Sequence, residues 1–285
     1  MEFHRPPHIY VGKVNIKVAD LERSLTFYKD LIGFQILEQS GKRAILTANG
    51  RTPLLIIEQP DNVIPKQRRT TGLYHFALLL PNRSDLGAVL RHLLQNRYPI
   101  EGGSDHRVSE ALYLSDPDGN GIEIYRDRPS TSWEWNNNEV VMTTEPLDAE
   151  SLLNEGEDVK WEGLPNATLM GHIHLHVSQI ANTEQFYQGG LGFDIVTRYG
   201  NQALFMSTGR YHHHIGLNTW NGIGAPTPVE NSIGLGSFTL IFPDSMTRDK
   251  IIEQLQSIDA PVTKKASNYI TKDPSGNTIE LQVNE

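Results

Sequence analysis

Histidine and acidic residues are the side chains of this chain that could do chemistry, because cysteine is absent. The 285 residues include 11 His and 34 Asp or Glu, but no Cys. Disulfides, thiolate nucleophiles and thiolate-bound metals are therefore excluded, and any metal ion must be held by His, Asp or Glu. Two histidine-rich segments run from His172 to His176 and from His212 to His214. The first alternates with apolar residues, which is typical of a strand.

The composition favours a folded protein that acts on a small molecule. With 38% hydrophobic and 21% charged residues, disorder is not expected, and the length favours two domains. The net charge of −9 and the pI near 5.7 argue against nucleic-acid and anionic-membrane partners. We also expect a cytoplasmic protein, because the first residues lack a signal-peptide pattern and no apolar stretch is long enough to span a bilayer.

An internal repeat provides the elements that must position these side chains. The segment Val14 to Val18 recurs as Ile173 to Val177, a shift of 159 positions (14 to 173). The same shift carries Phe27-Tyr28 onto Phe186-Tyr187, and Gly33-Phe34 onto Gly192-Phe193. Each copy has the pattern of a strand, an amphipathic helix and further strands. The repeated unit is therefore βαβββ.

A second unit of the same kind follows each copy and closes with an Asp-Pro-x-Gly-Asn turn and an Ile-Glu strand, at Asp116 to Glu123 and at Asp273 to Glu280. We therefore predict an α+β fold of four modules in two domains, 9–127 and 169–284. The intervening residues 128–168 show no sustained period and are expected to form a linker, with a short helix near Leu147–Leu153.

Four βαβββ modules with these Phe-Tyr, Gly-Phe and Asp-Pro-x-Gly-Asn-x-Ile-Glu signatures resemble the vicinal oxygen chelate superfamily. The likeness covers nearly the whole chain outside the linker. It identifies the fold strongly and the function weakly, because the superfamily includes glyoxalases, drug-binding resistance proteins and ring-cleaving dioxygenases. Function must therefore come from the site.

The resemblance places metal ligands on the concave face of the first and last strands of a module. In modules one to four, the first position holds Lys13, His75, His172 and Ser237, and the second holds Ile57 or the adjacent Glu58, Glu123, Gly216 and Glu280. Only the crossed pairing of modules two and three completes a site, with His75, Glu123 and His172. We predict that pairing, within one chain or across a homo-oligomer, and a divalent metal on the three residues. Iron(II) is expected and manganese(II) is the alternative.

Gly216 stands where glyoxalase I has a fourth ligand, and the missing side chain would leave room for a bidentate substrate and dioxygen. The chain therefore resembles the type I extradiol dioxygenases, which use O2 to cleave catechols, small aromatic diols, to a hydroxymuconic semialdehyde-type product. The resemblance implies roles for three further residues. His213 would shuttle a proton near its own pKa, Tyr113 would hydrogen-bond the bound hydroxylate, and His106 would be the second histidine of the family pattern.

Other histidines are expected to support the site rather than react. His174 and His176 share the concave parity of His172 and would line the substrate pocket. His212 and His214 would point the other way along a strand and be structural. The repeat supplies an internal control, since modules one and four carry Lys13, Leu54, Ser237, Ile270 and Thr263 where modules two and three carry His172, His213, His75, Tyr113 and His106.

Two other functions stay open on the sequence alone. A metal-free binding protein, like the resistance members, predicts an aromatic groove and no metal. A glyoxalase-type lyase or isomerase predicts a fourth ligand near Gly216. The substituents on a catechol substrate are not determined by the sequence.

Overall fold

Each of the four repeats folds as a strand, a helix and three further strands, as the sequence predicts. The computed structural model describes residues 2–266 and 268–284. Module one contains β1 (Tyr10–Lys17), α1 (Leu21–Thr26), β2 (Gln35–Ser40), β3 (Arg43–Thr47) and β4 (Pro53–Glu58). Module two contains β5 (Gly72–Leu79), α2 (Arg83–Gln95), β6 (Gly102–Asp105), β7 (Ser109–Ser115) and β8 (Gly121–Asp127).

The second half of the chain repeats this order. Module three contains β12 (Leu169–His176), α4 (Ile180–Glu184), β13 (Asp194–Tyr199), β14 (Ala203–Ser207) and β15 (Ile215–Asn218). Module four contains β16 (Gly234–Phe242), α5 (Ser245–Ser257), β17 (Val262–Lys265), β18 (Asn268–Lys272) and β19 (Thr278–Val283). Single π-helical turns extend α1 over Phe27–Ile32 and α4 over Gln185–Gly190.

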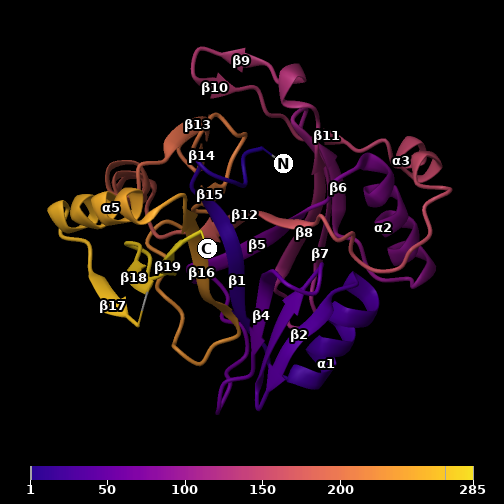
Figure 1. Ribbon diagram of the computed structural model, residues 1–285, viewed down its shortest axis with the longest axis horizontal. Coiled ribbons are helices and arrows are strands. Elements are labelled where there is room, and N and C mark those ends of the chain that lie inside the picture. Colours follow the sequence, from indigo (N-terminus) through magenta and orange to yellow (C-terminus); the bar gives the residue numbers. More distant parts are fainter. Residues whose placement is uncertain (1, 267, 285) are drawn as a thin grey trace.

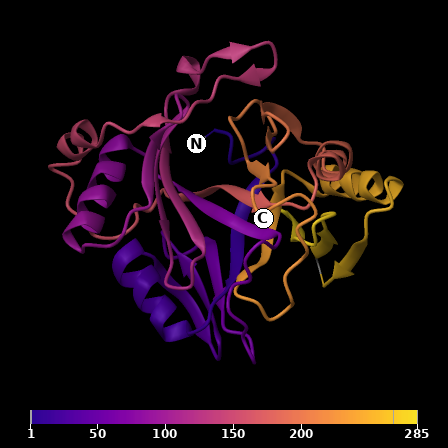
Figure 2. The same cartoon turned by 180° about the vertical axis from the view of Figure 1, so that it is seen from behind.

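Two curled sheets join modules from different halves of the chain. Modules two and three, with β11 (Glu145–Pro146) from the segment between them, form a nine-stranded sheet with the order β11-β6-β7-β8-β5-β12-β15-β14-β13, which we call the site sheet. Modules one and four form an eight-stranded second sheet with the order β17-β18-β19-β16-β1-β4-β3-β2. Their first strands lie together at the centre of the molecule, with α2 and α5 at opposite sides (Figures 1 and 2). The predicted crossed pairing is therefore confirmed, and it closes within one chain.

Alternation of side chains sets which face of each sheet is concave. On β12, Ile173 and Leu175 are fully buried on the convex face, and on β1, Val14 and Ile16 are fully buried in the same way. Because successive side chains of a strand point to opposite faces, the intervening residues face the concave side. His172 and His174 are thereby brought to the concave surface of the site sheet.

The two repeated signatures bind to each other and link the sheets. The Tyr28 hydroxyl donates to Asp116 Oδ2 at 2.9 Å, and the Tyr187 hydroxyl donates to Asp273 Oδ2 at 3.2 Å. In each pair the tyrosine lies on the helical turn of a module of one sheet, and the aspartate lies in the turn before the last strand of a module of the other sheet. Each carboxylate also accepts backbone N–H groups of its own turn, such as Asn120 N–H at 2.8 Å. The signatures therefore hold the fold together, which explains why they say little about chemistry.

Residues 128–168 form more than a connection between domains. They contain a 3₁₀ turn (Ser130–Ser132), β9 (Trp135–Asn136), β10 (Glu139–Val140), β11 (Glu145–Pro146) and α3 (Ala149–Glu155). Strand β11 extends the site sheet beside β6, and α3 corresponds to the predicted short helix. Helix α3 packs against α2 so closely that a Cβ at Gly87 would lie 2.2 Å from the Leu152 carbonyl oxygen. The division into domains 9–127 and 169–284 stays a proposal about the sequence repeats.

Among the described residues, every helix is too short or too polar to cross a lipid bilayer.

Candidate metal centre

His75, Glu123 and His172 converge from three adjacent strands of the site sheet. They lie on β5, β8 and β12, and one ligand atom from each comes within 4.8 Å of the others. The Nε2 atoms of His75 and His172 lie 3.0 and 3.1 Å from Glu123 Oε2. The exposed fraction is 6% for His75, 3% for Glu123 and 0% for His172. Two imidazoles and a carboxylate are thus gathered in a buried place.

The protonation states and hydrogen bonds of these residues suit a divalent metal. Burial lowers the pKa of His172 to about 4, so its ring is neutral at physiological pH. Burial opposes ionisation of Glu123, but the His172 and His75 rings beside it hold the pKa of the carboxyl well below its usual range. Within the described residues, His75 Nε2 is buried and has no hydrogen-bond partner of suitable geometry, although Glu123 Oε2 lies 3.0 Å away. The neutral His172 ring, the ionised carboxylate and the unsatisfied nitrogen of His75 suit the binding of a divalent metal.

A fourth protein ligand is not part of this cluster. Among the described His, Asp and Glu side chains, three and no more form a group that could hold a metal ion. Gly216 lies on β15 opposite His174, and a Cβ there would come within 2.8 Å of His174 Cγ. The expectation that Gly216 leaves room for substrate and dioxygen is wrong, because the His174 ring occupies the space beside this glycine. The three-ligand set therefore stands on the cluster itself.

Tyr113 and His106 lie together on the β7 side of the cluster. Tyr113 is paired with Glu123 across β7 and β8, and its ring centroid is 5.7 Å from that of His75. His106 Nδ1–H donates to the Thr143 carbonyl at 2.6 Å, which leaves Nε2 to accept from the Tyr113 hydroxyl at 2.7 Å. Burial first, and Glu123 second, raise the pKa of Tyr113 well above 10. Tyr113 is therefore a neutral phenol oriented by His106.

His213 lies on the other side of the cluster, with its ring tilted against that of His172 and the centroids 4.1 Å apart. Burial lowers the pKa of His213 well below 6.5, so the expectation of a pKa near the working pH is not met. Its ring is 8% exposed and is neutral in this surrounding. A neutral imidazole beside the cluster can accept a proton at the ring nitrogen that has the lone pair.

His212 contacts His213 directly, although a structural role was expected for it. Its Nε2–H donates to Asp127 Oδ1 at 2.8 Å, and its Nδ1 lies 2.9 Å from His213 Nδ1. Because the carboxylate fixes the proton on Nε2, His212 Nδ1 must accept from His213 Nδ1–H. The chain Asp127–His212–His213 thus leaves the lone pair on His213 Nε2. The earlier expectation fails because β15 begins only at Ile215, so strand alternation does not apply to His212.

His174 and His176 lie on the concave face between the cluster and the open end of the sheet. Asn218 joins them: His176 Nδ1–H donates to Asn218 Oδ1 at 2.7 Å, and Asn218 Nδ2 donates to His174 Nε2 at 3.0 Å. His214, in contrast, has the structural role expected of it, because its Nε2–H donates to the Phe3 carbonyl at 3.0 Å.

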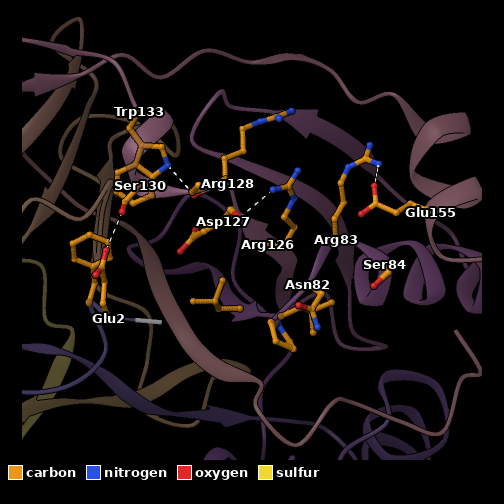
Figure 3. A pocket seen from close by; sticks show the side chains of 15 residues that line it. Glu2, Asn82, Arg83, Ser84, Arg126, Asp127, Arg128, Ser130, Trp133 and Glu155 are labelled. Atoms are coloured by element: carbon orange, nitrogen blue, oxygen red, sulfur yellow. Dashed lines mark hydrogen bonds and ion pairs between the residues drawn. The ribbon is translucent and has the colours of Figure 1, made fainter.

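The two ends of the site differ. At one end Phe3 stacks on Trp133 with centroids 5.5 Å apart and contacts Tyr211 at 5.1 Å, so aromatic rings close the site. A pocket of about 590 Å³ lies outside this closed end (Figure 3). At the other end Tyr74 and Trp220 meet edge to face at 5.3 Å and are 38% and 45% exposed. The Tyr74 end is therefore the more exposed end of the site.

Several of these residues were missed by sequence reasoning. Tyr74, Asn218 and Trp220 flank strand ends, and Asp127 lies 85 positions from its partner His212. Only Tyr74 carried a signal, as an aromatic residue next to a ligand histidine. The others become visible when the strands are in place.

The second sheet shows the same positions filled differently. Ser237, the counterpart of His75, donates to Glu280 Oε1 at 3.0 Å, and Lys13, the counterpart of His172, donates to Gln282 Oε1 at 2.9 Å. Ile270 is paired with Glu280 as Tyr113 is with Glu123, so that correspondence is confirmed.

Two of the predicted correspondences between modules are wrong. Asn15 is paired with Ile56 as His174 is with Gly216, so the counterpart of Gly216 is Ile56 rather than Ile57 or Glu58. Thr263 corresponds to Gly102 rather than to His106. The connections between strands differ in length, so a constant offset fails there.

Fold and site together define the class of protein. The model of the Glyoxalase/Bleomycin resistance protein/Dioxygenase superfamily matches residues 10–124 and 169–281, and the chain belongs to this superfamily.

Individual relatives narrow the likeness. The chain is 46% identical over 274 residues to the Catechol-2,3-dioxygenase of Bacillus subtilis (strain 168), which covers 95% of each chain. It is 30% identical over 40% of its length to Biphenyl-2,3-diol 1,2-dioxygenase 3 of Rhodococcus globerulus, covering 62% of that protein. Glyoxalase I from Zea mays has a similar fold, with a TM-score of 0.58 at 14% identity, covering 96% of this chain and 92% of that one.

Proposed function

We propose that this chain is an extradiol ring-cleaving dioxygenase, similar to catechol 2,3-dioxygenase, that inserts both atoms of O2 into a catechol to give a 2-hydroxymuconic semialdehyde-type product. The observation that carries the proposal is the buried cluster of His75, Glu123 and His172, with Tyr113 on one side and His213 on the other. The 46% identity over 95% of both chains to a protein named Catechol-2,3-dioxygenase supports it.

His75, Glu123 and His172 would hold one divalent metal, which we propose to be iron(II), with manganese(II) as the alternative because both accept this donor set. When bound, the metal supplies Lewis acidity and electron transfer between the diol and dioxygen. Three protein ligands leave positions for both substrates. A glyoxalase-type reaction is less well supported, because the family's fourth ligand is absent from the described cluster.

The surrounding residues of the chain would move and hold protons. His213 Nε2, left with its lone pair by the Asp127–His212 chain, is the base for a diol hydroxyl. Tyr113 is a neutral phenol held by His106 and would donate a hydrogen bond to an oxygen that gains negative charge. The aromatic closure by Phe3, Trp133 and Tyr211 keeps bulk water away from the site.

Anaerobic purification followed by elemental analysis and oxygen uptake tests the proposal. We expect one bound metal per chain, and oxygen consumption that requires catechol and is matched by absorbance of the ring-opened product. Reconstitution with iron(II) or manganese(II) decides which metal supports turnover. Bound metal without catechol-dependent oxygen uptake would contradict the dioxygenase and leave the metal site, whereas absence of metal would favour a binding protein. Cytoplasmic location belongs to the same proposal.

A further inference from the structure

A second, larger cavity lies at the open end of the site and is rich in positive charge. Its volume is about 970 Å³. The charged side chains that line it are Lys17, Lys66, Arg68, Arg69 and Lys272, with Asp118 and Glu230. Five cations and two carboxylates make the lining positive by three charges, in a chain whose net charge is −9. Such a concentration of charge opposite in sign to the whole attracts anions.

The cations of this cavity differ from the other clustered arginines in having no carboxylate partner. Over the described residues, none of the five forms an ion pair. Lys17 and Lys66 donate to the backbone carbonyls of Glu230 and Gly119. Asp118 forms an ion pair with Arg23, which does not line the cavity.

The pocket in Figure 3 shows the opposite arrangement. There Arg83 contacts Glu155, and Arg83, Arg126 and Arg128 all contact Glu110, which lies outside the lining. Those arginines are neutralised by the protein itself. The cations of the larger cavity remain available to a ligand.

A row of contacting rings runs from the cavity lining to the proposed metal ligands. His176 lines the cavity, and its ring centroid is 5.0 Å from that of Tyr74. Tyr74 in turn lies 4.9 Å from the ring of His75. Trp220 faces both Tyr74 and His174. His176 in the cavity lining is thus two ring-to-ring contacts away from His75. A ligand with one aromatic ring and a short side chain is long enough to reach from the cavity to His75.

We propose, resting on the function proposed above, that this cavity binds the carboxylate of a catechol that carries an acidic side chain. The two hydroxyls would face the metal ligands, the ring would lie against Tyr74 and Trp220, and the acid would reach the cations around Lys66 and Arg69. A carboxylate forms charge-assisted hydrogen bonds with lysine and arginine, and unpaired cations gain most from such a partner.

A carboxylic acid and its methyl ester test the proposal, because they differ in charge and little in shape. The probes are 3-(3,4-dihydroxyphenyl)propanoate and its methyl ester, compared by kcat/KM in oxygen uptake. They are also compared by calorimetric binding to protein without metal. We expect the acid to be preferred by about tenfold or more in both measurements, with the preference falling as ionic strength rises.

Charge-removing variants locate the effect. Lys66→Met and Arg69→Gln should each reduce the acid-to-ester ratio by about fivefold, while Lys250→Met, an exposed lysine on α5, should leave the ratio unchanged. Equal values for acid and ester, or a preference that survives both variants, would overturn the proposed carboxylate site. Absence of oxygen uptake with every diol would instead overturn the dioxygenase, and the calorimetric comparison would still decide the cavity.

Discussion

The site sheet and the second sheet share one register but carry different chemistry. In the site sheet His174 lies opposite His75, and in the second sheet Asn15 lies opposite Ser237 in the same place. Glu280 occupies the position of Glu123, yet it accepts hydrogen bonds from hydroxyl groups instead of facing imidazoles. A carboxylate in the repeated Ile-Glu strand is therefore not a sign of a metal by itself.

This difference shows what folding demands and what chemistry demands. Both sheets keep the buried apolar residues of their convex faces and the tyrosine–aspartate links. Only the site sheet adds buried histidines, which are costly because their charged forms lose solvation. A fold that tolerates serine and lysine at these positions has no structural need for the imidazoles.

The largest effect is expected when a proposed ligand of the site sheet is removed. Removal of its counterpart in the second sheet is the control. His172→Ala should abolish retention of metal and lower oxygen uptake by about 10³-fold or more, because two ligands do not hold the ion. Lys13→Ala should retain the metal. Elemental analysis after desalting measures both, and metal retained in His172→Ala would contradict the crossed site.

A somewhat smaller effect is expected for the base. His213→Ala should keep the metal but reduce kcat by about 10²- to 10⁴-fold, since a positioned base contributes that much. Single-turnover rates under oxygen measure the loss. A variant with normal kcat would remove His213 from the mechanism without affecting the assignment of the ligands.

The hydrogen-bond chain behind His213 should have a moderate effect. Asp127→Asn preserves shape but can donate to His212 Nε2, which reverses the tautomers and protonates His213 Nε2. We expect kcat to fall about 10- to 100-fold with metal retained, and the pH profile of kcat to change. Asp249→Asn on α5 is the control for removing a carboxylate. An unchanged pH profile would show that Asp127 is only structural.

The smallest effect concerns acid stability of the metal-free protein. Burial lowers the pKa of His4 and of His172 from 6.5 to about 4 in the folded state. The unfolded chain therefore binds more protons between these values, and stability is lost as pH falls from about 6.5 to 4. Each ring accounts for roughly 3 kcal/mol at most.

Hydrogen exchange at several pH values locates this loss. The strands β5 and β12 of the site sheet should open before β1 and β16 of the second sheet, and bound metal should suppress the difference. Equal opening of both sheets would contradict the assignment of the acid-induced loss of stability to the buried histidines.

The sequence predicts well the architecture and the convergence of His75, Glu123 and His172, because each is over-determined. Four copies of a pattern fix the strands, and only one pairing of modules places His75, Glu123 and His172 together. Tyr113 follows from family spacing and His106 is the nearest histidine to the family position, and the structure brings the two into contact. Interactions that depend on loops were not predictable, such as Asp127 with His212, because loop geometry has no period. The reason given for Gly216 failed for a related cause: the residue facing it, His174, is known only once β12 and β15 are paired.

The crossed sheets also have a consequence for how the chain is made. Tyr10 of β1 pairs with Ile241 of β16, which emerges from the ribosome 231 residues later (241 minus 10). At common rates of synthesis β1 waits roughly 10 to 50 s for its partner. Neither half of the chain can complete a sheet during that time, so both expose unpaired central strands. Biosynthesis of this protein should therefore depend on protection of nascent strand edges. When its two halves are expressed separately, each should complete its sheets only by associating with the other.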